Sequence, residues 1–330
     1  MTIKRLAVAI LLLTVAASAS AAEIRGAWTA DATGKDAGKI YFQLNRKHNN
    51  NGRTFPLTSF TGLSDAQVRS ASQVPVTFAL RAEAGTISFE GTFKDGFGAG
   101  QFSFSPNPGF LDSVRSMGIS TESKKRRSGR EDDPDEALLH YAIRDLSTAF
   151  IRSMQAEGYN VSLDQYHSFR IFKVSPDLVR ELRSLGYDNV SADDLVGSQI
   201  HKVTPAYIRE MRAAGFGNLS LDELVATRIH KVTPEFAREM SELGYGGLDL
   251  DDLTSFRIHR VTAEYIRNMR ELGYDKIPAN KLVAMRIHRV TPEFIRELSA
   301  AGYSKIPVDK LISMRIHGVD AAFAKKMNGM

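Results

Sequence analysis

The sequence predicts an α+β protein in which a small antiparallel β domain, a sandwich or an open barrel, precedes an αα-hairpin solenoid of about six 29-residue repeats. Three observations lead to this fold class. Apolar and polar residues alternate up to about residue 105, which is typical of half-buried strands. Beyond that point, an Ile-containing triplet and a Gly–aromatic pair each recur every 29 residues.

The first 22 residues have the features of a secretory signal peptide. Lys4 and Arg5 form a positive end, an apolar run follows, and the small residues of "ASASAA" suit cleavage near Ala21 or Ala22. The apolar run is shorter than the roughly 20 residues that span a bilayer. We therefore expect a periplasmic or secreted bacterial protein without a transmembrane segment. Because the chain has no cysteine, disulfides and thiolate metal sites are excluded.

Residues 23–105 are expected to form the β domain, with about six strands. "KDG" at 94–96 indicates a tight hairpin, and "NNNG" at 49–52 indicates a further turn. Trp28 is the only tryptophan, and we expect it in the core rather than on a ligand-binding surface.

The remaining chain divides into three predicted segments. Residues 106–118 match a first solenoid helix, residues 119–133 form a charged flexible loop, and residues 134–330 form the αα-repeat solenoid. The loop contains "KKRR" followed by acidic residues and has too few apolar side chains to order itself. The basic block is not a nucleic-acid signal if the chain is exported.

Two series of short motifs carry the repeat. The triplets are RIF 170–172, QIH 199–201, RIH 228–230, RIH 257–259, RIH 286–288 and RIH 315–317. The Gly–aromatic pairs are 186–187, 215–216, 244–245, 273–274 and 302–303. Each unit is too short to be stable alone, so neighbouring units are expected to stack.

Each unit is expected to contain two short helices. In one unit, Thr204 is the N-cap of the first helix, Pro205 follows it, and Gly215 ends the helix in the left-handed conformation. Ser220 and Glu223 form a capping box at the start of the second helix. The apolar face predicted for this second helix consists of Leu221, Leu224, Val225, Ile229 and Val232.

Histidine and basic residues recur once per unit and form a possible partner-binding ladder. Its members are His201, His230, His259, His288, His317, Arg209, Arg238, Arg267, Arg296, Lys202, Lys231, Arg260 and Arg289. Equivalent side chains on stacked helices stay about 8–10 Å apart, whereas zinc ligands must converge within a few Å. Packing or hydrogen bonding is therefore the simplest role for the histidines, with ligand contact as the alternative. The basic residues either complement helix dipoles or form a stripe for an acidic peptide, polysaccharide or lipid headgroup.

No motif indicates an enzyme. The sequence lacks His-Glu-x-x-His and Gly-x-Ser-x-Gly, and it has no cysteine nucleophile. We expect no catalytic residue, metal or cofactor. The net charge of +5 is mild, which argues against a dedicated polyanion binder, and nucleic acid is not an expected partner.

The motif "VTPEFIRELSAAGY", with "RIHRVTP" and the upstream "AGTISFEGTFKDGFGAGQFSFSPNPGF", resembles exported repeat regions. Such regions are found alone or behind membrane metallopeptidases of the β-lactam-sensor type. The resemblance covers most of residues 76–330. The chain lacks the protease motif and membrane helices of those sensors, so the resemblance implies neither proteolysis nor signalling.

These expectations together favour an exported, non-enzymatic binding or scaffold module that uses its repeat surface to bind a protein or peptide. One alternative is an envelope protein that binds an anionic glycan or lipid through the Arg/Lys ladder. The other is an enzyme with its site in the β domain.

Overall fold

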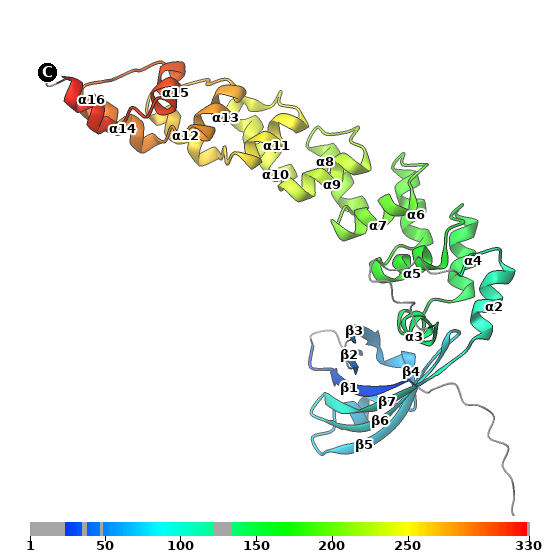
Figure 1. Cartoon of the computed structure of the whole chain (residues 1–330). Coiled ribbons are helices and arrows are strands. Elements are labelled where there is room, and N and C mark those ends of the chain that lie inside the picture. Colours follow the sequence, from blue (N-terminus) through cyan, green and yellow to red (C-terminus); the bar gives the residue numbers. More distant parts are fainter. Residues whose placement is uncertain (1–23, 35–37, 47–48, 122–133, 329–330) are drawn as a thin grey trace, which may run out of the picture. The chain divides into compact units, whose positions relative to one another are not determined.

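The computed structural model describes residues 24–34, 38–46, 49–121 and 134–328. The chain divides into two compact units, Met1–Ile171 and Phe172–Met330, which are described separately (Figure 1). The predicted signal peptide lies outside the described residues. Residues 122–133, which make up most of the predicted charged loop, also lie outside them. No helix in the described ranges is long and apolar enough to cross a membrane.

The first unit contains one antiparallel sheet of seven strands, in the order β3-β2-β1-β7-β6-β5-β4. The strands are β1 (Ile24–Asp31), β2 (Lys39–Arg46), β3 (Asn49–Pro56), β4 (Phe60–Thr61), β5 (Val74–Ala82), β6 (Gly85–Lys94) and β7 (Phe97–Pro106). The predicted N-terminal antiparallel β domain is confirmed. Strand β3 contains the "NNNG" that was predicted as a turn, because an edge strand needs hydrogen-bond partners on one side only and tolerates polar residues.

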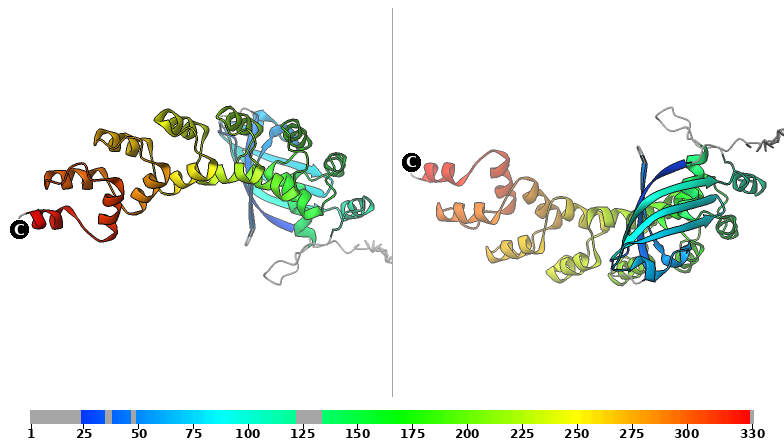
Figure 2. Two further views of the ribbon diagram at one scale, coloured as in Figure 1. Left: turned by 90° about the horizontal axis from the view of Figure 1, so that it is seen from above. Right: turned by 90° about the horizontal axis from the view of Figure 1, so that it is seen from below.

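The sheet is curled into a half-barrel rather than folded into a sandwich (Figure 2). Phe42 on β2 and Phe60 on β4 are separated by four strands in the sheet, yet their ring centroids lie 4.7 Å apart. The chain passes from edge strand β3 to edge strand β4 through a single 3-10 turn, Leu57–Ser59. The two edges of the sheet therefore approach each other around a shared interior.

Aromatic side chains fill this interior. Trp28 is 1% exposed, and its ring lies 5.5 Å from the rings of Phe78 and Phe93. The indole Nε1 donates hydrogen bonds to the carbonyl oxygens of Glu90 (3.2 Å) and Gln101 (3.0 Å). The expectation that Trp28 belongs to the core is confirmed.

The helices follow the sheet, so the coarse α+β class is confirmed. The first unit contains α1 (Asp65–Val68), α2 (Gly109–Ser116), α3 (Pro134–Arg144), α4 (Thr148–Ala156) and α5 (Leu163–Phe172, which ends at the division). The second unit contains α6 (Pro176–Ser184), α7 (Ala192–Ile200), α8 (Pro205–Ala213), α9 (Leu221–His230), α10 (Pro234–Met240), the π-helix η2 (Ser241–Tyr245), α11 (Leu250–Ile258), α12 (Ala263–Glu271), α13 (Ala279–Ile287), α14 (Pro292–Ala300), α15 (Val308–Ile316) and α16 (Ala321–Asn328).

Helix α3 packs directly on strands β5, β6 and β7. Arg46 of β2 forms an ion pair with Glu136 of α3. Arg53 of β3 donates a hydrogen bond to the carbonyl oxygen of Ile143, at 2.5 Å. The sheet and the first helices therefore belong to one packed body.

The predicted helix ends are confirmed. The Thr204 side chain accepts a hydrogen bond from the N–H of Tyr207, and Pro205 begins helix α8. Gly215 has a φ of 98°, and the N–H of Phe216 donates to the carbonyl oxygen of Met211 at 3.0 Å, which is the expected Schellman geometry. Ser220 and Glu223 form the predicted capping box.

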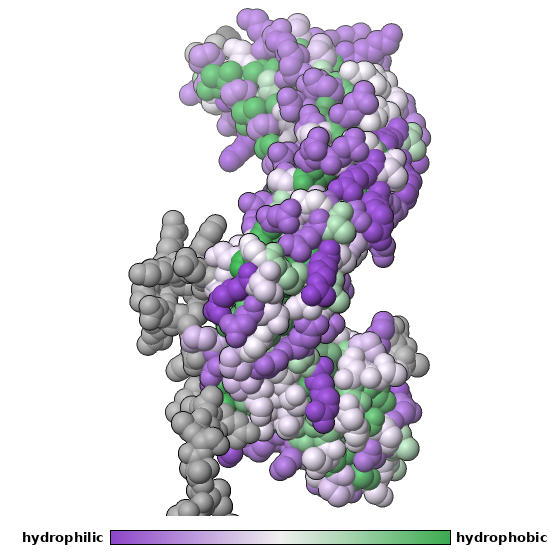
Figure 3. Space-filling model, turned by 90° about the vertical axis from the view of Figure 1, so that its right-hand side faces the viewer, coloured by the Kyte–Doolittle hydropathy of each residue, from purple (hydrophilic) through white to green (hydrophobic). Residues whose placement is uncertain are grey.

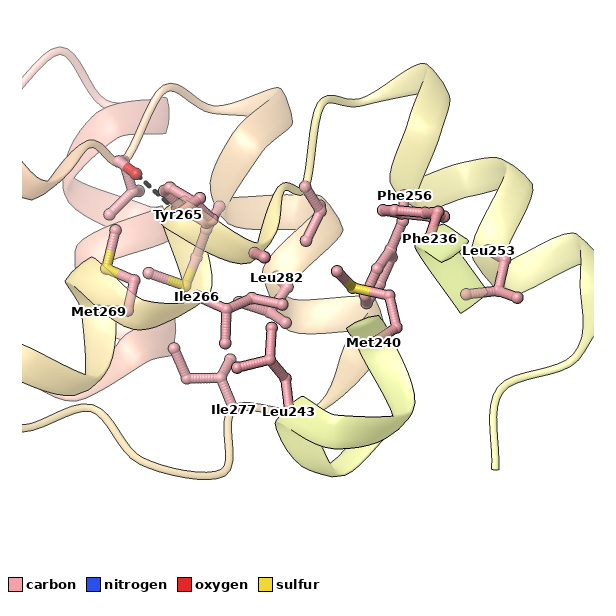
Figure 4. Close-up of a cluster of buried hydrophobic side chains, with 14 of the residues drawn as sticks. Phe236, Met240, Leu243, Leu253, Phe256, Tyr265, Ile266, Met269, Ile277 and Leu282 are labelled. Carbon is pink, nitrogen blue, oxygen red and sulfur yellow. Dashed lines mark hydrogen bonds between the residues drawn. The ribbon is translucent and has the colours of Figure 1, made fainter. Parts of the chain in front are cut away.

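In the second unit, helices that are equivalent in the repeat pack on one another. Helix α7 contacts α9, which contacts α11, followed in turn by α13 and α15. Buried side chains join these layers, and Figure 4 shows Phe236, Met240, Leu253 and Phe256 within one such cluster.

The predicted apolar face of the second helix is wrong at one position. Ile229 is 53% exposed, whereas Thr227 is fully buried. The two residues are about 200° apart on a helix, so burial of one turns the other outward. Thr227 is tolerated inside because its hydroxyl bonds to the carbonyl oxygen of Leu224 (2.6 Å) and to the hydroxyl of Tyr207 (2.7 Å).

Candidate functional site

The predicted histidines lie where the second helices end. His201, His259, His288 and His317 are C-cap residues, and His230 is the last residue of α9. The first four in the chain are half-buried and His317 is exposed. In the described part of the chain, their side chains make no hydrogen bond or ion pair, and no group of three potential metal ligands is found.

The residue after each of these histidines holds the backbone in a strained conformation. Lys202, Lys231, Arg260 and Arg289 have φ values of 56–59°, the left-handed region that favours glycine. Gly318 occupies the equivalent position in the last unit, with a φ of 70°. This role was not predicted from the sequence, although Gly318 at the equivalent position is a signal for it.

The basic members of the ladder fall into two different rows. The row on the first helices is paired: Arg209–Glu181 at 2.8 Å, Arg238–Glu235 at 3.2 Å, Arg267–Glu239 at 3.3 Å and Arg296–Glu293 at 3.2 Å. The second row, defined here as the basic turn row, has exposed side chains without an ion pair to any described residue: Lys202, Lys231, Arg260 and Arg289. Of the two rows, the basic turn row is therefore the one without ion pairs among the described residues.

A row of exposed isoleucines accompanies the basic turn row, two residues before it. This isoleucine row consists of Ile200, Ile229, Ile258, Ile287 and Ile316, each 49–55% exposed. Its members lie on α7, α9, α11, α13 and α15, which contact one another in that order. On the face shown in Figure 3, hydrophobic residues are exposed among hydrophilic ones over the helices at the top. This row was not predicted from the sequence, because Ile229 was expected on the apolar face of its helix.

In three of the four RIH triplets, the arginine bonds a carbonyl oxygen of the turn that carries these rows; these are Arg228, Arg286 and Arg315. The guanidinium of Arg228 lies 3.7 Å from the ring centroid of Tyr207. Its Nη2 and Nε donate to the carbonyl oxygen of Lys202, at 2.8 and 3.1 Å. Arg286 makes similar contacts: its guanidinium lies 4.8 Å from the Tyr265 ring centroid, and its Nε donates to the carbonyl oxygen of His259 at 3.3 Å, one residue earlier in the turn. These arginines are structural, and they position the neighbouring histidine and basic residue.

Replacing Arg228 with lysine is expected to lower the free energy of unfolding by about 1–2 kcal/mol, because lysine cannot stack on Tyr207 and bond one carbonyl twice. Urea unfolding followed by circular dichroism measures the loss. The matched control is Arg209→Lys on the paired row, for which a change below about 0.5 kcal/mol is expected. Equal losses in both variants would contradict the structural role of Arg228.

Further hydrogen bonds join successive units, with one exception. The hydroxyls of Tyr187, Tyr245 and Tyr274 donate to carbonyl oxygens 32 residues ahead, at 2.7–2.8 Å. Phe216 replaces this tyrosine between α8–α9 and α10–α11. At the same junction, Ser241 replaces the arginine that bonds a carbonyl oxygen from positions 212 and 270. Ser299 replaces this arginine again one unit after Arg270, where the bond from Tyr274 is kept.

In the described part of the chain, Arg257 also lacks a hydrogen bond that its equivalents make across other junctions. Its Nε is buried, with no hydrogen-bond partner among the described residues, although Arg228 and Arg286 donate from the equivalent atom. Its guanidinium still lies 3.7 Å from the ring centroid of Phe236. In the described structure, this junction is therefore held mainly by apolar packing.

A separate titratable side chain is buried in the first unit. His167 of α5 packs edge-on against Tyr141 of α3, with ring centroids 5.0 Å apart. Its Nε2 is buried without a hydrogen-bond partner. Burial lowers the pKa of His167 from 6.5 to about 4, with further lowering by His140 and Arg144.

The free energy of unfolding of the first unit should therefore depend on pH through His167. Because its folded-state pKa lies below the ordinary value, this contribution is present above about pH 6.5 and is lost as the pH falls towards 4. Linkage gives a loss of about 2–3 kcal/mol between pH 7 and pH 4.5. Urea unfolding at both pH values should show a smaller loss for His167→Gln than for wild type. The exposed control, His317→Gln, should follow wild type, and an unchanged loss in His167→Gln would contradict the assignment.

No family model matches the chain, and no curated protein or solved structure was found to be similar to it.

Proposed function

We propose that the protein is an exported, non-enzymatic binding or scaffold module that binds a protein or peptide partner on a helical-repeat surface. We also propose that its helical region is an αα solenoid of about six 29-residue repeats. Contacts that recur at fixed spacing support the solenoid, including the tyrosine hydroxyl bonds to carbonyls 32 residues ahead. The signal-like N-terminal sequence supports export.

The observation that carries the binding function is the isoleucine row beside the basic turn row. A single exposed apolar residue needs no explanation, but one at the same position of five successive units makes a stripe along helices that contact one another. Arg228, Arg286 and Arg315 donate to carbonyl oxygens of turns that present it. A stripe of this kind suits a partner that runs along the array.

Capture of partners from an envelope extract tests this function. A variant of the isoleucine row should lose the proteins that the wild type retains; it carries Ile229→Ser, Ile258→Ser and Ile287→Ser. The matched control changes the paired row and should retain them; it carries Arg238→Ala, Arg267→Ala and Arg296→Ala. If both variants capture the wild-type set, the isoleucine row is not the binding surface.

The charge of the basic turn row favours a second candidate, an envelope protein that binds an anionic glycan or lipid. The salt dependence of binding distinguishes the two candidate functions. Binding to an anionic polymer should be lost between low and moderate ionic strength, whereas binding through the isoleucines should persist. Aromatic side chains fill the interior of the β domain, so we propose no enzyme site there.

A further inference from the structure

We infer that the isoleucine row and the basic turn row together receive an extended acidic peptide in which every third residue is apolar. The inference rests on the proposed function and defines the chemistry of its partner. One apolar side chain of the peptide would contact each isoleucine, and the acidic side chains would lie towards the basic turn row.

The spacing of the row favours this peptide conformation. The helices that carry the isoleucines contact one another in succession, and packed helices lie about 8–10 Å apart. A polyproline II peptide rises about 3.1 Å per residue with three residues per turn, so residues i, i+3 and i+6 share a face at about 9.3 Å. A β-strand repeats each face after about 6.6 Å and would lose register within two units.

The charge of the surface favours an acidic partner. Lys202, Lys231, Arg260 and Arg289 are exposed and form no ion pair with any described residue. The carboxylates of Glu235 and Glu293, four residues after Lys231 and Arg289, pair with Arg238 and Arg296. Glu264, at the equivalent position after Arg260, forms no ion pair with a described residue. A second copy of the chain would bring two rows of the same sign together, which argues against self-association through this surface.

The histidines supply the polar contacts that such a peptide needs. A polyproline II backbone has no internal hydrogen bonds, so its carbonyl oxygens need outside donors. One histidine lies between each isoleucine and each basic residue, and its imidazole has no hydrogen bond in the described structure. An imidazole N–H can donate to a peptide carbonyl once per unit.

A membrane surface fits the row less well than a peptide does. In the described residues of α7, α9, α11, α13 and α15, each helix exposes one large apolar side chain. The resulting stripe is one residue wide, which suits a linear ligand rather than a bilayer.

Binding of synthetic peptides tests the inference. The probe is fluorescein-labelled (Leu-Pro-Glu)6, measured by fluorescence anisotropy with the purified protein at moderate salt. One control has the same composition with leucines at irregular spacing, and another replaces glutamate with lysine. We expect the shuffled peptide to bind at least 10-fold more weakly and the lysine peptide not to bind.

Three variants then locate the peptide on the surface. The isoleucine-row variant described above should weaken binding at least 10-fold. The basic-turn variant should do the same; it carries Lys231→Gly, Arg260→Gly and Arg289→Gly. Glycine suits the left-handed φ at these positions, as Gly318 does in the last unit, so the fold should be retained. The paired-row variant should bind within 2-fold of wild type, and thermal unfolding checks that all three fold.

Equal binding of the ordered and shuffled peptides would overturn the inference. Binding to phosphatidylserine vesicles without binding to the peptide would overturn it in favour of a membrane. If no peptide binds but envelope partners still depend on the isoleucine row, the peptide inference fails and the proposed function stands. If envelope capture is also unchanged in the isoleucine-row variant, both fail.

Discussion

Replacing Phe256 with alanine should lower the free energy of unfolding by about 3–5 kcal/mol. The Phe256 side chain is fully buried in α11, beside Phe236, Met240 and Leu253 in one cluster (Figure 4). The ring of Tyr245 packs against it edge-on, with centroids 5.9 Å apart. Removing the ring leaves a cavity between two layers of helices, because the short helices cannot collapse independently of their neighbours. Chemical unfolding followed by circular dichroism at 222 nm measures the loss.

Ile258→Ala is the matched control for this experiment. Ile258 lies on the same helix, two residues away, but it is 55% exposed. Its truncation should change the free energy of unfolding by less than about 0.5 kcal/mol. Comparable losses in the two variants would show that the isoleucine row faces the core, and the proposed binding surface would then be wrong.

Replacing Trp28 with alanine should have an effect of similar size, about 3–5 kcal/mol, on the β domain. The indole fills the centre of the half-barrel and donates hydrogen bonds to backbone carbonyls of β6 and β7. Alanine removes the aromatic contacts and leaves a space that the two sheet edges enclose. Since Trp28 is the only tryptophan, the variant has to be followed by circular dichroism rather than by indole fluorescence.

Phe97→Ala is the control for Trp28→Ala. Phe97 is also aromatic and lies on β7, but it is 57% exposed. A loss of less than about 0.5 kcal/mol is expected for it. A tolerated Trp28→Ala change would mean that the half-barrel is not organised around the indole.

Local signals in the sequence predict the helix ends well. Thr204 and Pro205 act on the first turn of α8 and Gly215 acts on its last turn, so each effect is local and follows from the residues alone. Burial was harder to predict, because Thr227 is polar but satisfies its hydroxyl inside the core. That inward turn is what exposes Ile229. Strand β3 was missed for a related reason, since Asn and Gly residues do not resemble a strand until a neighbouring strand pairs with them.

The candidate surface was predicted only in part. The 29-residue spacing identifies the histidines and both basic rows, but it cannot tell a paired arginine from an unpaired one. The partners are fixed by folding: Glu181 lies 28 residues before Arg209, whereas Glu235 lies three residues before Arg238. The stacking of Arg228 on Tyr207 joins residues on two helices and has no local signature.

The junction at Phe216, Ser241 and Arg257 has a mechanical consequence. It lacks the hydrogen bonds by which its neighbours resist shear, while apolar packing allows small sliding at little cost. The helices before and after it can therefore pivot as two stiffer blocks. A ligand that contacts both Ile229 and Ile258 would restrict sliding at this junction. Binding should therefore make the helical region of the second unit stiffer.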